Sequence, residues 1–229
     1  EDKLRIVNTF KLKGEVVAVT GDSVDDAPVL RAADVGCAMG VTGTDIAKGN
    51  ADVVLLEDSY ISVVGAIRES RGIFSNIKRI ASFVISCAAG ELMLMLFEVL
   101  VFGLPALSAP ALLWLNLVVG FGLGIGLCAE GSDEGDMLIP PRPIKQIFFS
   151  RNYIVSLLLQ GGWLLVLGLI SYAIGGSATL FVSLVMAETM LAFSLRAERS
   201  ILKTGIFTNK VLLCALGVSV LSIILLVCT

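Results

Sequence analysis

Short apolar runs separated by polar segments occupy the first third of the chain, and long apolar stretches occupy the rest. Three short apolar runs predict strands, at residues 16–20, 35–39 and 53–56, and the first of them, rich in β-branched residues, is expected to be buried. Two segments between them predict short helices, at 26–33 and at 44–49, the latter with Thr44 as its N-cap. Strands that alternate with helices are typical of a parallel, doubly wound α/β sheet, and residues 1–72 are long enough for only part of one.

The apolar stretches predict an all-α polytopic membrane domain over residues 73–229. One helical pattern starts at Ile61 and crosses into the first stretch with no glycine or proline break at the boundary, which indicates a continuous helix. The chain then holds five apolar segments, each long enough for a hydrocarbon core of about 30 Å. They are residues 79–103, 109–129, 152–174, 177–196 and 210–228.

Composition agrees with this division. The mean hydropathy is +0.89, and 22 of the 37 charged residues lie within the first 79 positions. The net charge of −3 without a basic cluster excludes a nucleic-acid binder. The chain has no histidine, which excludes histidine-based catalysis and histidine metal ligands. Five cysteines without a C-x-x-C pair indicate packing residues rather than a disulfide framework.

Lysine and arginine indicate the orientation in the membrane. They gather in the two long loops, as Arg142, Lys145 and Arg151 in the first and as Arg199 and Lys203 in the second. The two short turns have neither residue type. Because cytoplasmic loops carry the excess of positive charge, we expect a multi-pass protein whose long loops and N-terminal soluble part are cytoplasmic.

The string T-G-D-S-V-D-D-A-P at residues 20–28 is the most specific in the chain. It places Asp22, Asp25 and Asp26 in a loop at the C-terminal end of the first predicted strand, where α/β sheets bind ligands. Carboxylates clustered in this way favour a hard cation such as Mg²⁺. The alternative is a solvated acidic loop that caps the following helix.

This string resembles the T-G-D-G-V-N-D-A-P motif of P-type ATPases. Further segments resemble the same family in the same order, particularly its type II calcium pumps, at residues 32–36, 43–48, 113–118 and 140–142. The resemblance implies that the chain is the C-terminal part of a pump. It would comprise the end of a HAD-like, Rossmann-like phosphorylation domain and the fifth to ninth membrane helices.

The resemblance also implies roles for residues near the motif. Asp22 matches a Mg²⁺ ligand beside the phosphorylated aspartate, and Asp26 matches a second acidic residue that organises the phosphoryl site and the metal. Thr20 and Gly21 belong to the same cofactor-binding loop, and Lys3 matches a lysine that contacts the transferred phosphoryl group. The alternative for Lys3 is an exposed surface lysine. The ATP site would lie mostly outside this chain.

Two departures fall inside the motif, and one further element is missing. Ser23 replaces a glycine and Asp25 replaces an asparagine, and both changes are expected to weaken anion binding. Residues 42–44 read T-G-T but lack the upstream Asp-Lys of the family's phosphorylation motif. We therefore expect that the chain alone does not hydrolyse ATP.

Carboxylates inside the apolar segments are candidate transport residues. Glu91, Asn116 and Glu188 match positions that supply cation ligands in calcium pumps. Glu98, two helical turns beyond Glu91, matches no such ligand and is open to three interpretations: a second site, a proton carrier or a residue near the far interface. The alternative for all the carboxylates is a neutral, hydrogen-bonded contact between helices.

The predicted transport site departs from a calcium pump at three positions. Ala88, Val119 and Gly120 stand where calcium pumps have an asparagine, a threonine and an aspartate. Ca²⁺ prefers six to eight oxygens, so a proton or a monovalent cation is favoured over Ca²⁺. Glycines at 120, 122, 124 and 126 indicate either close helix packing or local unwinding.

These observations predict one function and two rivals. The favoured function is that of a P-type ATPase, which couples ATP hydrolysis, through an aspartyl-phosphate, to cation transport across a lipid bilayer. The chain would perform it together with the missing N-terminal part of the same protein. One rival is a degenerate member with a binding or regulatory role and no transport. The other is a membrane-anchored Mg²⁺ phosphatase, which the missing nucleophile argues against.

Overall fold

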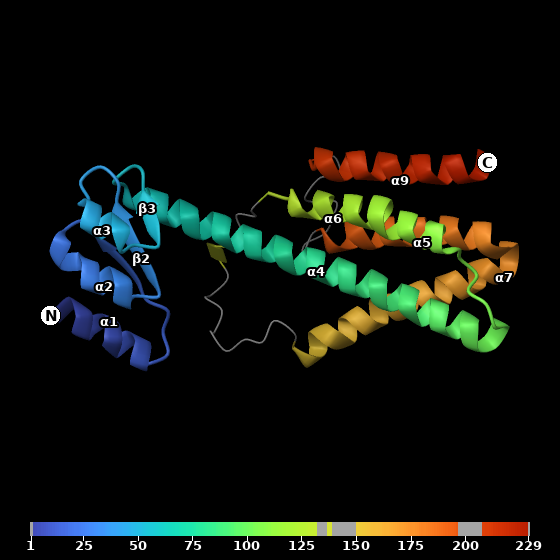
Figure 1. Cartoon of the computed structure of the whole chain (residues 1–229), viewed down its shortest axis with the longest axis horizontal. Helices are drawn as coiled ribbons and strands as arrows, with labels where there is room; N and C mark the ends of the chain where they lie inside the picture. The colour runs from blue at the N-terminus through green and yellow to red at the C-terminus, as the bar shows by residue number, and fades with distance from the viewer. Residues whose placement is uncertain (1, 132–136, 139–149, 197–207, 229) are drawn as a thin grey trace. The chain divides into compact units, whose positions relative to one another are not determined.

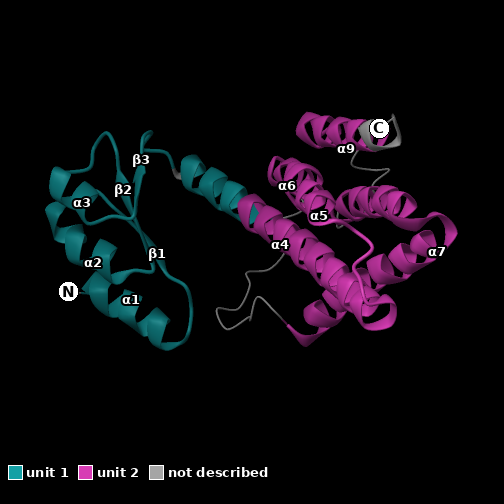
Figure 2. Cartoon of the chain, turned by 45° about the vertical axis from the view of Figure 1, so that its right-hand side comes forward, with its two compact units in different colours: residues 1–71, 134–147 teal, residues 72–133, 148–229 magenta. Residues whose placement is uncertain are grey.

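The computed structural model describes residues 2–131, 137–138, 150–196 and 208–228 (Figure 1). Residues 1–71 belong to one compact unit, and residues 72–133 and 148–229 form a second (Figure 2). A small parallel sheet with short helices precedes long apolar helices, which confirms the predicted fold class. The domain boundary expected between residues 72 and 73 stays a prediction, because a compact unit is not by itself an independently folding domain.

The first unit is a three-stranded parallel sheet in the order β1-β2-β3. Its elements are α1 (Asp2–Leu12), β1 (Ala18–Gly21), η1 (Val24–Asp26), α2 (Ala27–Ala32), β2 (Val35–Met39), α3 (Asp45–Gly49) and β3 (Val53–Leu55). Leu30 of α2, Ala38 of β2 and Ala47 of α3 form its small buried core. The side chain of Thr44 accepts the backbone N–H of Ala47, which confirms the predicted N-cap.

The structure corrects the expectation that the first strand is buried. Residues 16 and 17 lie outside β1, and Val16 is 60% exposed. In the strand itself Ala18 and Thr20 are exposed, Val19 is half-buried and Gly21 is buried. Within the described residues, β1 pairs with β2 on one side only. Val19 packs against the small core, whereas Val16 and Ala18 stay exposed, which a pattern of β-branched residues does not reveal.

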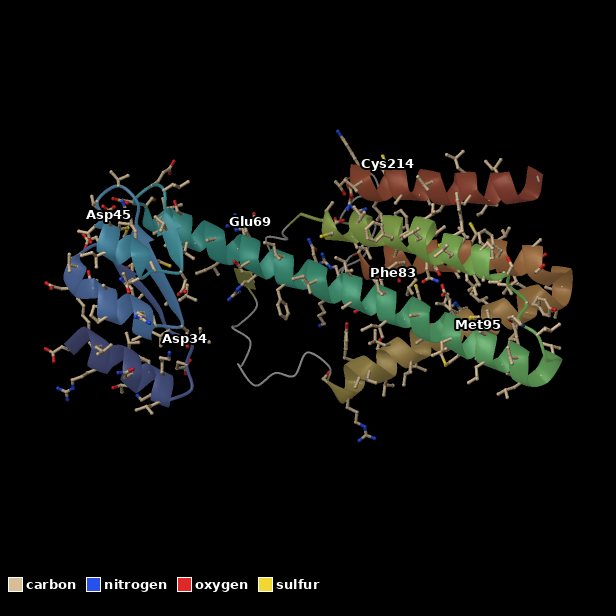
Figure 3. All side chains as sticks on the ribbon, viewed as in Figure 1. Asp34, Asp45, Glu69, Phe83, Met95 and Cys214 are labelled. Atoms are coloured by element: carbon tan, nitrogen blue, oxygen red, sulfur yellow. The ribbon has the colours of Figure 1, made fainter. Side chains whose placement is uncertain are left out.

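Helix α1 was not anticipated, because only Val7 of its residues is buried. Its last turn is attached to the sheet through Asp34, which is labelled in Figure 3. Lys11 forms an ion pair with Asp34 at 3.2 Å, and the N–H of Val17 donates to the same carboxylate at 3.0 Å. The Val17 bond, followed by the Lys11 bond, lowers the pKa of Asp34.

Helix α4 (Tyr60–Phe102) is 43 residues long and continues from the first unit into the second. At 1.5 Å per residue it extends about 65 Å. This confirms the continuous helix predicted from Ile61. Gly103 follows with a φ of 78°, a left-handed conformation that suits a glycine at a helix C-terminus.

The second unit contains the remaining helices. They are α5 (Ala109–Trp114), the π-helical segment η2 (Leu115–Gly120), α6 (Phe121–Cys128), α7 (Arg151–Leu195) and α9 (Lys210–Cys228). Three helical segments are long and apolar enough to cross a membrane: 61–102, 109–128 and 151–195. The described apolar part of α9, Lys210–Ile224, is shorter.

Helix α7 is broken in the middle, at the turn that the sequence places between residues 174 and 177. Gly175 and Gly176 leave the helical conformation, and Gly176 has a φ of 71° and a ψ of −156°. Only glycine adopts such angles readily. The 45 residues of α7 therefore form two helical segments rather than one.

Glycines bring the helices of the second unit close together. A Cβ on Gly126 of α6 would lie 2.8 Å from the Cα of Leu212 in α9, and one on Gly161 of α7 would lie 3.1 Å from the backbone nitrogen of Gly90 in α4. Gly126 thus fits the packing interpretation of the glycine series. The π-helical turn over residues 115–120 fits the other interpretation of the glycine series, a local departure from the α-helix.

Candidate functional site

The acidic loop after β1 is organised around the buried carboxylate of Asp26. Lys3 of α1 donates to its Oδ1 at 2.7 Å, and the Ser23 hydroxyl donates to its Oδ2 at 2.9 Å. The backbone N–H groups of Asp22 and Ser23 point at the same Oδ2 at 3.4 Å. The loop closes tightly, since a Cβ on Gly21 would lie 2.6 Å from the Cβ of Asp26.

These bonds fix the ionisation of Asp26. The hydrogen bond from Lys3, opposed by burial and helped by Ser23, lowers the pKa of Asp26 to about 2. The same contact raises the pKa of Lys3. Asp26 is therefore an anion at neutral pH. The Lys3 side chain stays 71% exposed, so it pairs with Asp26 and still reaches the solvent.

The other residues of the loop face outward. Thr20, Asp22 and Asp25 are exposed, and the carbonyl of Asp22 accepts the N–H of Thr44 at 2.9 Å. Among the described residues, no group of three or more acidic or cysteine side chains is placed to hold a metal ion. The structure therefore brings Lys3 and Asp26 together and leaves the Asp22 carboxylate open to the solvent.

A second cluster lies inside the helices of the second unit. The amide of Asn116, in η2, donates to Glu91 Oε2 of α4 at 2.6 Å. Glu188 of α7 is 2% exposed and lies close to Glu91. One further oxygen of each carboxyl, Glu91 Oε1 and Glu188 Oε2, is buried without a partner in the described part of the chain. The three predicted transport residues therefore form one contiguous site.

The positions that depart from a calcium pump surround this cluster. A Cβ on Gly120 would lie 3.9 Å from Glu188 Oε2, so an aspartate there would enter the cluster. The N–H of Phe121 bonds to the carbonyl of Asn116, five residues earlier, which widens the helix at this point. Val119 is buried, whereas Ala88 and Asn116 are exposed.

Sequence reasoning missed a polar junction where α6, α7 and α9 end or begin. The Arg196 guanidinium, 2% exposed, donates to Glu130 Oε2 at 2.8 Å, and Asn209 donates to the same oxygen and to the carbonyl of Gly126. Asn76 of α4 donates to the carbonyls of Cys128 and Glu130. The only signal in the sequence was a set of isolated charged and amide residues: Asn76, Glu130, Arg196 and Asn209.

Some predicted features lie outside the described residues. They are the P-P-R motif at 140–142 and four of the basic residues that set the predicted orientation, Arg142, Lys145, Arg199 and Lys203.

Comparison with known proteins identifies the family. The model of the family described as "Cation transporting ATPase, C-terminus" matches residues 104–229. Calcium-transporting ATPase 1 of Bacillus cereus is 37% identical over 247 residues, covering 96% of this chain and 28% of that protein. The calcium-transporting ATPase of Bacillus subtilis is 33% identical, covering 99% and 27%. P-type sodium-transporting ATPase4 of Toxoplasma gondii is 42% identical over 153 residues, covering 67% and 11%.

The chain thus spans little more than a quarter of the length of the bacterial relatives it matches. The family match, together with the long apolar helices, makes it part of an integral, multi-pass membrane protein. The chain belongs to the P-type cation-transporting ATPases and corresponds to their C-terminal region.

Proposed function

We propose that this chain is the C-terminal part of a pump that couples ATP hydrolysis, through an aspartyl-phosphate, to cation transport. One observation carries the proposal: the contiguous cluster of Glu91, Asn116 and Glu188 contains buried carboxyl oxygens that have no hydrogen-bond partner among the described residues. Its first member lies on α4, the helix that continues from the unit holding the acidic loop. Unpaired carboxyl groups inside membrane helices are costly unless they bind something.

The acidic loop supports the phosphoryl half of the proposal. Lys3 holds its charge beside Asp26 and stays exposed, so its ammonium group is available to a phosphoryl oxygen. Oδ1 of Asp26 accepts from Lys3 of α1 and Oδ2 accepts from Ser23 of the loop, which suits a residue that positions Lys3 and the loop backbone. Asp22 is an exposed carboxylate of the loop and would supply a Mg²⁺ ligand.

Bound Mg²⁺ would neutralise charge on the transferred phosphoryl group. Thr20 and Gly21 would hold the loop that carries these residues. The ATP-binding site and the phosphorylated aspartate would lie in the remainder of the protein.

The cluster favours a proton or a monovalent cation. It offers two carboxyl groups and one amide, and Ala88, Val119 and Gly120 add no side-chain oxygen. Six to eight oxygens, as Ca²⁺ prefers, would require most ligands to come from outside this chain. Relatives include pumps named for calcium and for sodium, so the family accommodates more than one ion.

Phosphoenzyme formation tests this function directly. Membranes that contain the full-length protein are incubated with labelled ATP and a panel of cations. We expect a hydroxylamine-sensitive phosphoenzyme whose level depends on protons or on one monovalent cation. If a well-folded protein forms none with any cation, the chain belongs instead to a degenerate member that binds without transport.

A variant tests the cluster. Glu91→Gln removes the carboxylate that both Asn116 and Glu188 approach, so we expect cation-dependent transport to fall at least tenfold. Glu57→Gln, an exposed carboxyl group ahead of α4, is the control and should leave transport unchanged. Intact transport in Glu91→Gln would remove Glu91 from the site.

A further inference from the structure

Three loops follow the strands of the small sheet at its C-terminal edge, and hydrogen bonds join them in order. The first is the acidic loop after β1. The second is residues 40–44 after β2, here called the T-G-T loop, and the third is residues 56–59, which connect β3 to α4 (Figure 1). The T-G-T string lacks the upstream residues of a phosphorylation motif, so it is free for another role, which its contacts on both sides indicate.

Asp58, two residues ahead of α4, binds the T-G-T loop. Its Oδ1 accepts the N–H of Val41 at 3.0 Å, and its Oδ2 accepts the N–H and the hydroxyl of Thr42 at 2.7 and 2.6 Å. The bond from the Thr42 hydroxyl, followed by the one from the Val41 N–H, lowers the pKa of Asp58. The carboxylate is therefore ionised at neutral pH, and hydrogen bonds to a charged acceptor are stronger than neutral ones.

The other end of the T-G-T loop is bonded to the acidic loop. The N–H of Thr44 donates to the carbonyl of Asp22 at 2.9 Å, and the Thr44 side chain caps α3. Asp22 is the proposed Mg²⁺ ligand. A displacement of its backbone on binding of a phosphoryl group and Mg²⁺ would therefore reach Thr44 through one hydrogen bond.

The T-G-T loop is packed too closely to absorb such a displacement. A Cβ on Gly40 would overlap the carbonyl oxygen of Leu55 at the end of β3, and one on Gly43 would overlap the carbonyl oxygen of Met39. Neither glycine has a positive φ, so both positions require space rather than an unusual backbone conformation. A closely packed segment passes a displacement on to its neighbours instead of deforming.

Asp58 is the point at which this series of bonds approaches α4. Leu56 of the connecting segment is exposed, and the hydroxyl of Ser59 accepts the N–H of Ile61 within the first turn of the helix. Asp58 thus joins the T-G-T loop to the residues directly ahead of α4. From there the helix continues without interruption to Glu91 of the transport cluster.

We propose that Asp58 is a positioning residue for the pump, which transmits a displacement of the acidic loop, through the T-G-T loop, to the start of α4. This role requires no contact with phosphate, Mg²⁺ or the transported cation. The inference rests on the proposed pump function, because the displacement is the one that phosphoryl binding would cause. Without the Asp58 carboxylate, the acidic loop and α4 should stay folded but respond independently of each other.

Hydrogen exchange tests the transmission without any transport assay. The full-length protein is compared with and without orthovanadate and Mg²⁺, which together mimic a bound phosphoryl group. Exchange in the wild type should change at residues 20–28 and also at residues 60–71, the part of α4 within the first unit. Asp58→Asn should keep the first change and lose the second. Glu57→Gln, at the exposed neighbouring position, should behave as the wild type.

Two results of this experiment would refute the inference. One is an equal change at residues 60–71 in Asp58→Asn and in the wild type. The other is a wild type that responds at the acidic loop but not at residues 60–71. Should Asp58→Asn fail to fold, Thr42→Val decides in its place: a reduced response at residues 60–71 supports the inference, and a wild-type response overturns it.

A functional readout separates positioning from a purely structural role. Asp58→Asn should form a phosphoenzyme from ATP at close to the wild-type level, while the number of cations transported per ATP hydrolysed falls severalfold. A folding defect would instead lower phosphoenzyme and transport together. Asp58→Glu keeps a carboxylate and should recover part of the ratio. Thr42→Val removes the hydroxyl donor but leaves both backbone donors, so it should lower the ratio less than Asp58→Asn does.

Failure of the inference and failure of the pump function look different. If the wild type forms no phosphoenzyme and orthovanadate changes its exchange nowhere, the pump function fails and the inference fails with it. If the wild type forms a phosphoenzyme and Asp58→Asn keeps the wild-type ratio of transport to hydrolysis, the inference fails alone.

Discussion

Asp26 receives hydrogen bonds from a lysine on α1 and from a serine and two backbone N–H groups of its own loop. A buried carboxylate with this many donors both fixes the loop and needs its charge to do so. Because the pKa of Asp26 falls to about 2 from an ordinary 3.8, its charge stabilises the folded state. The stabilisation is complete above about pH 4 and is lost as the pH falls toward 2.

We predict that Asp26→Asn destabilises the full-length protein at pH 7 by about 1–3 kcal/mol, because its four hydrogen-bond donors lose a charged acceptor. The difference from wild type should shrink as the pH falls below 4. Asp25→Asn, at an exposed position in the same loop, is the control and should change stability by less than about 0.5 kcal/mol. Thermal unfolding followed at several pH values measures both, and a pH-independent difference would contradict the assignment.

Ser23 shows what sequence alone supplies at this scale. Its position in the motif predicted weaker anion binding, since a side chain replaces a glycine. The structure adds that the hydroxyl donates to Asp26, so this serine also takes part in holding the loop. Spacing places residues 20–28 after a strand, but the partner of a hydroxyl depends on a rotamer, which no spacing specifies.

At the scale of elements, glycine positions decide how closely the helices approach. Gly126 faces the backbone of α9, whereas a Cβ on Gly124 would meet no atom within 4 Å. The sequence shows both as members of one alternating series. Which member faces a neighbour depends on the π-helical turn at residues 115–120, which rotates the remainder of the helix relative to an uninterrupted α-helix.

We predict opposite effects for the two glycines. Gly126→Ala should destabilise the protein by about 1–3 kcal/mol, because its Cβ would meet the Leu212 backbone at 2.8 Å. Gly124→Ala should be neutral or stabilise by up to about 1 kcal/mol through helix propensity. Thermal unfolding in detergent compares the two, and similar melting temperatures would show that α6 and α9 do not pack as described.

The elements themselves were largely predictable from the pattern. The strands at 35–39 and 53–55, the cap at Thr44 and the glycine break in α7 follow from local preferences that the surroundings do not oppose. The exposed positions of β1 and the presence of helix α1 were not predictable, because both depend on which neighbouring elements are present. The sequence named Glu91, Asn116 and Glu188 as candidates, and their role as a site stays a prediction, whereas the contact of Arg196 with Glu130 required the structure.

At the scale of the whole molecule, α4 is the element through which the acidic loop and the carboxyl cluster can influence each other. It runs without interruption from Tyr60 to Phe102 and carries Glu91. A helix transmits a displacement along its axis only while its backbone hydrogen bonds are continuous. Gly65 lies in its second turn, and a Cβ there would meet no atom within 4 Å, so a substitution at this position changes the helix alone.

We therefore predict that Gly65→Pro uncouples phosphoenzyme formation from cation transport, while Gly65→Ala does not. Proline removes a backbone hydrogen bond and clashes with the preceding turn, at about 3 kcal/mol, whereas alanine is favourable in a helix. In the full-length protein, Gly65→Pro should still form a phosphoenzyme from ATP but should transport far fewer cations per ATP hydrolysed. Gly65→Ala should keep the wild-type ratio. An unchanged ratio in Gly65→Pro would show that coupling does not depend on the continuity of α4 at this position.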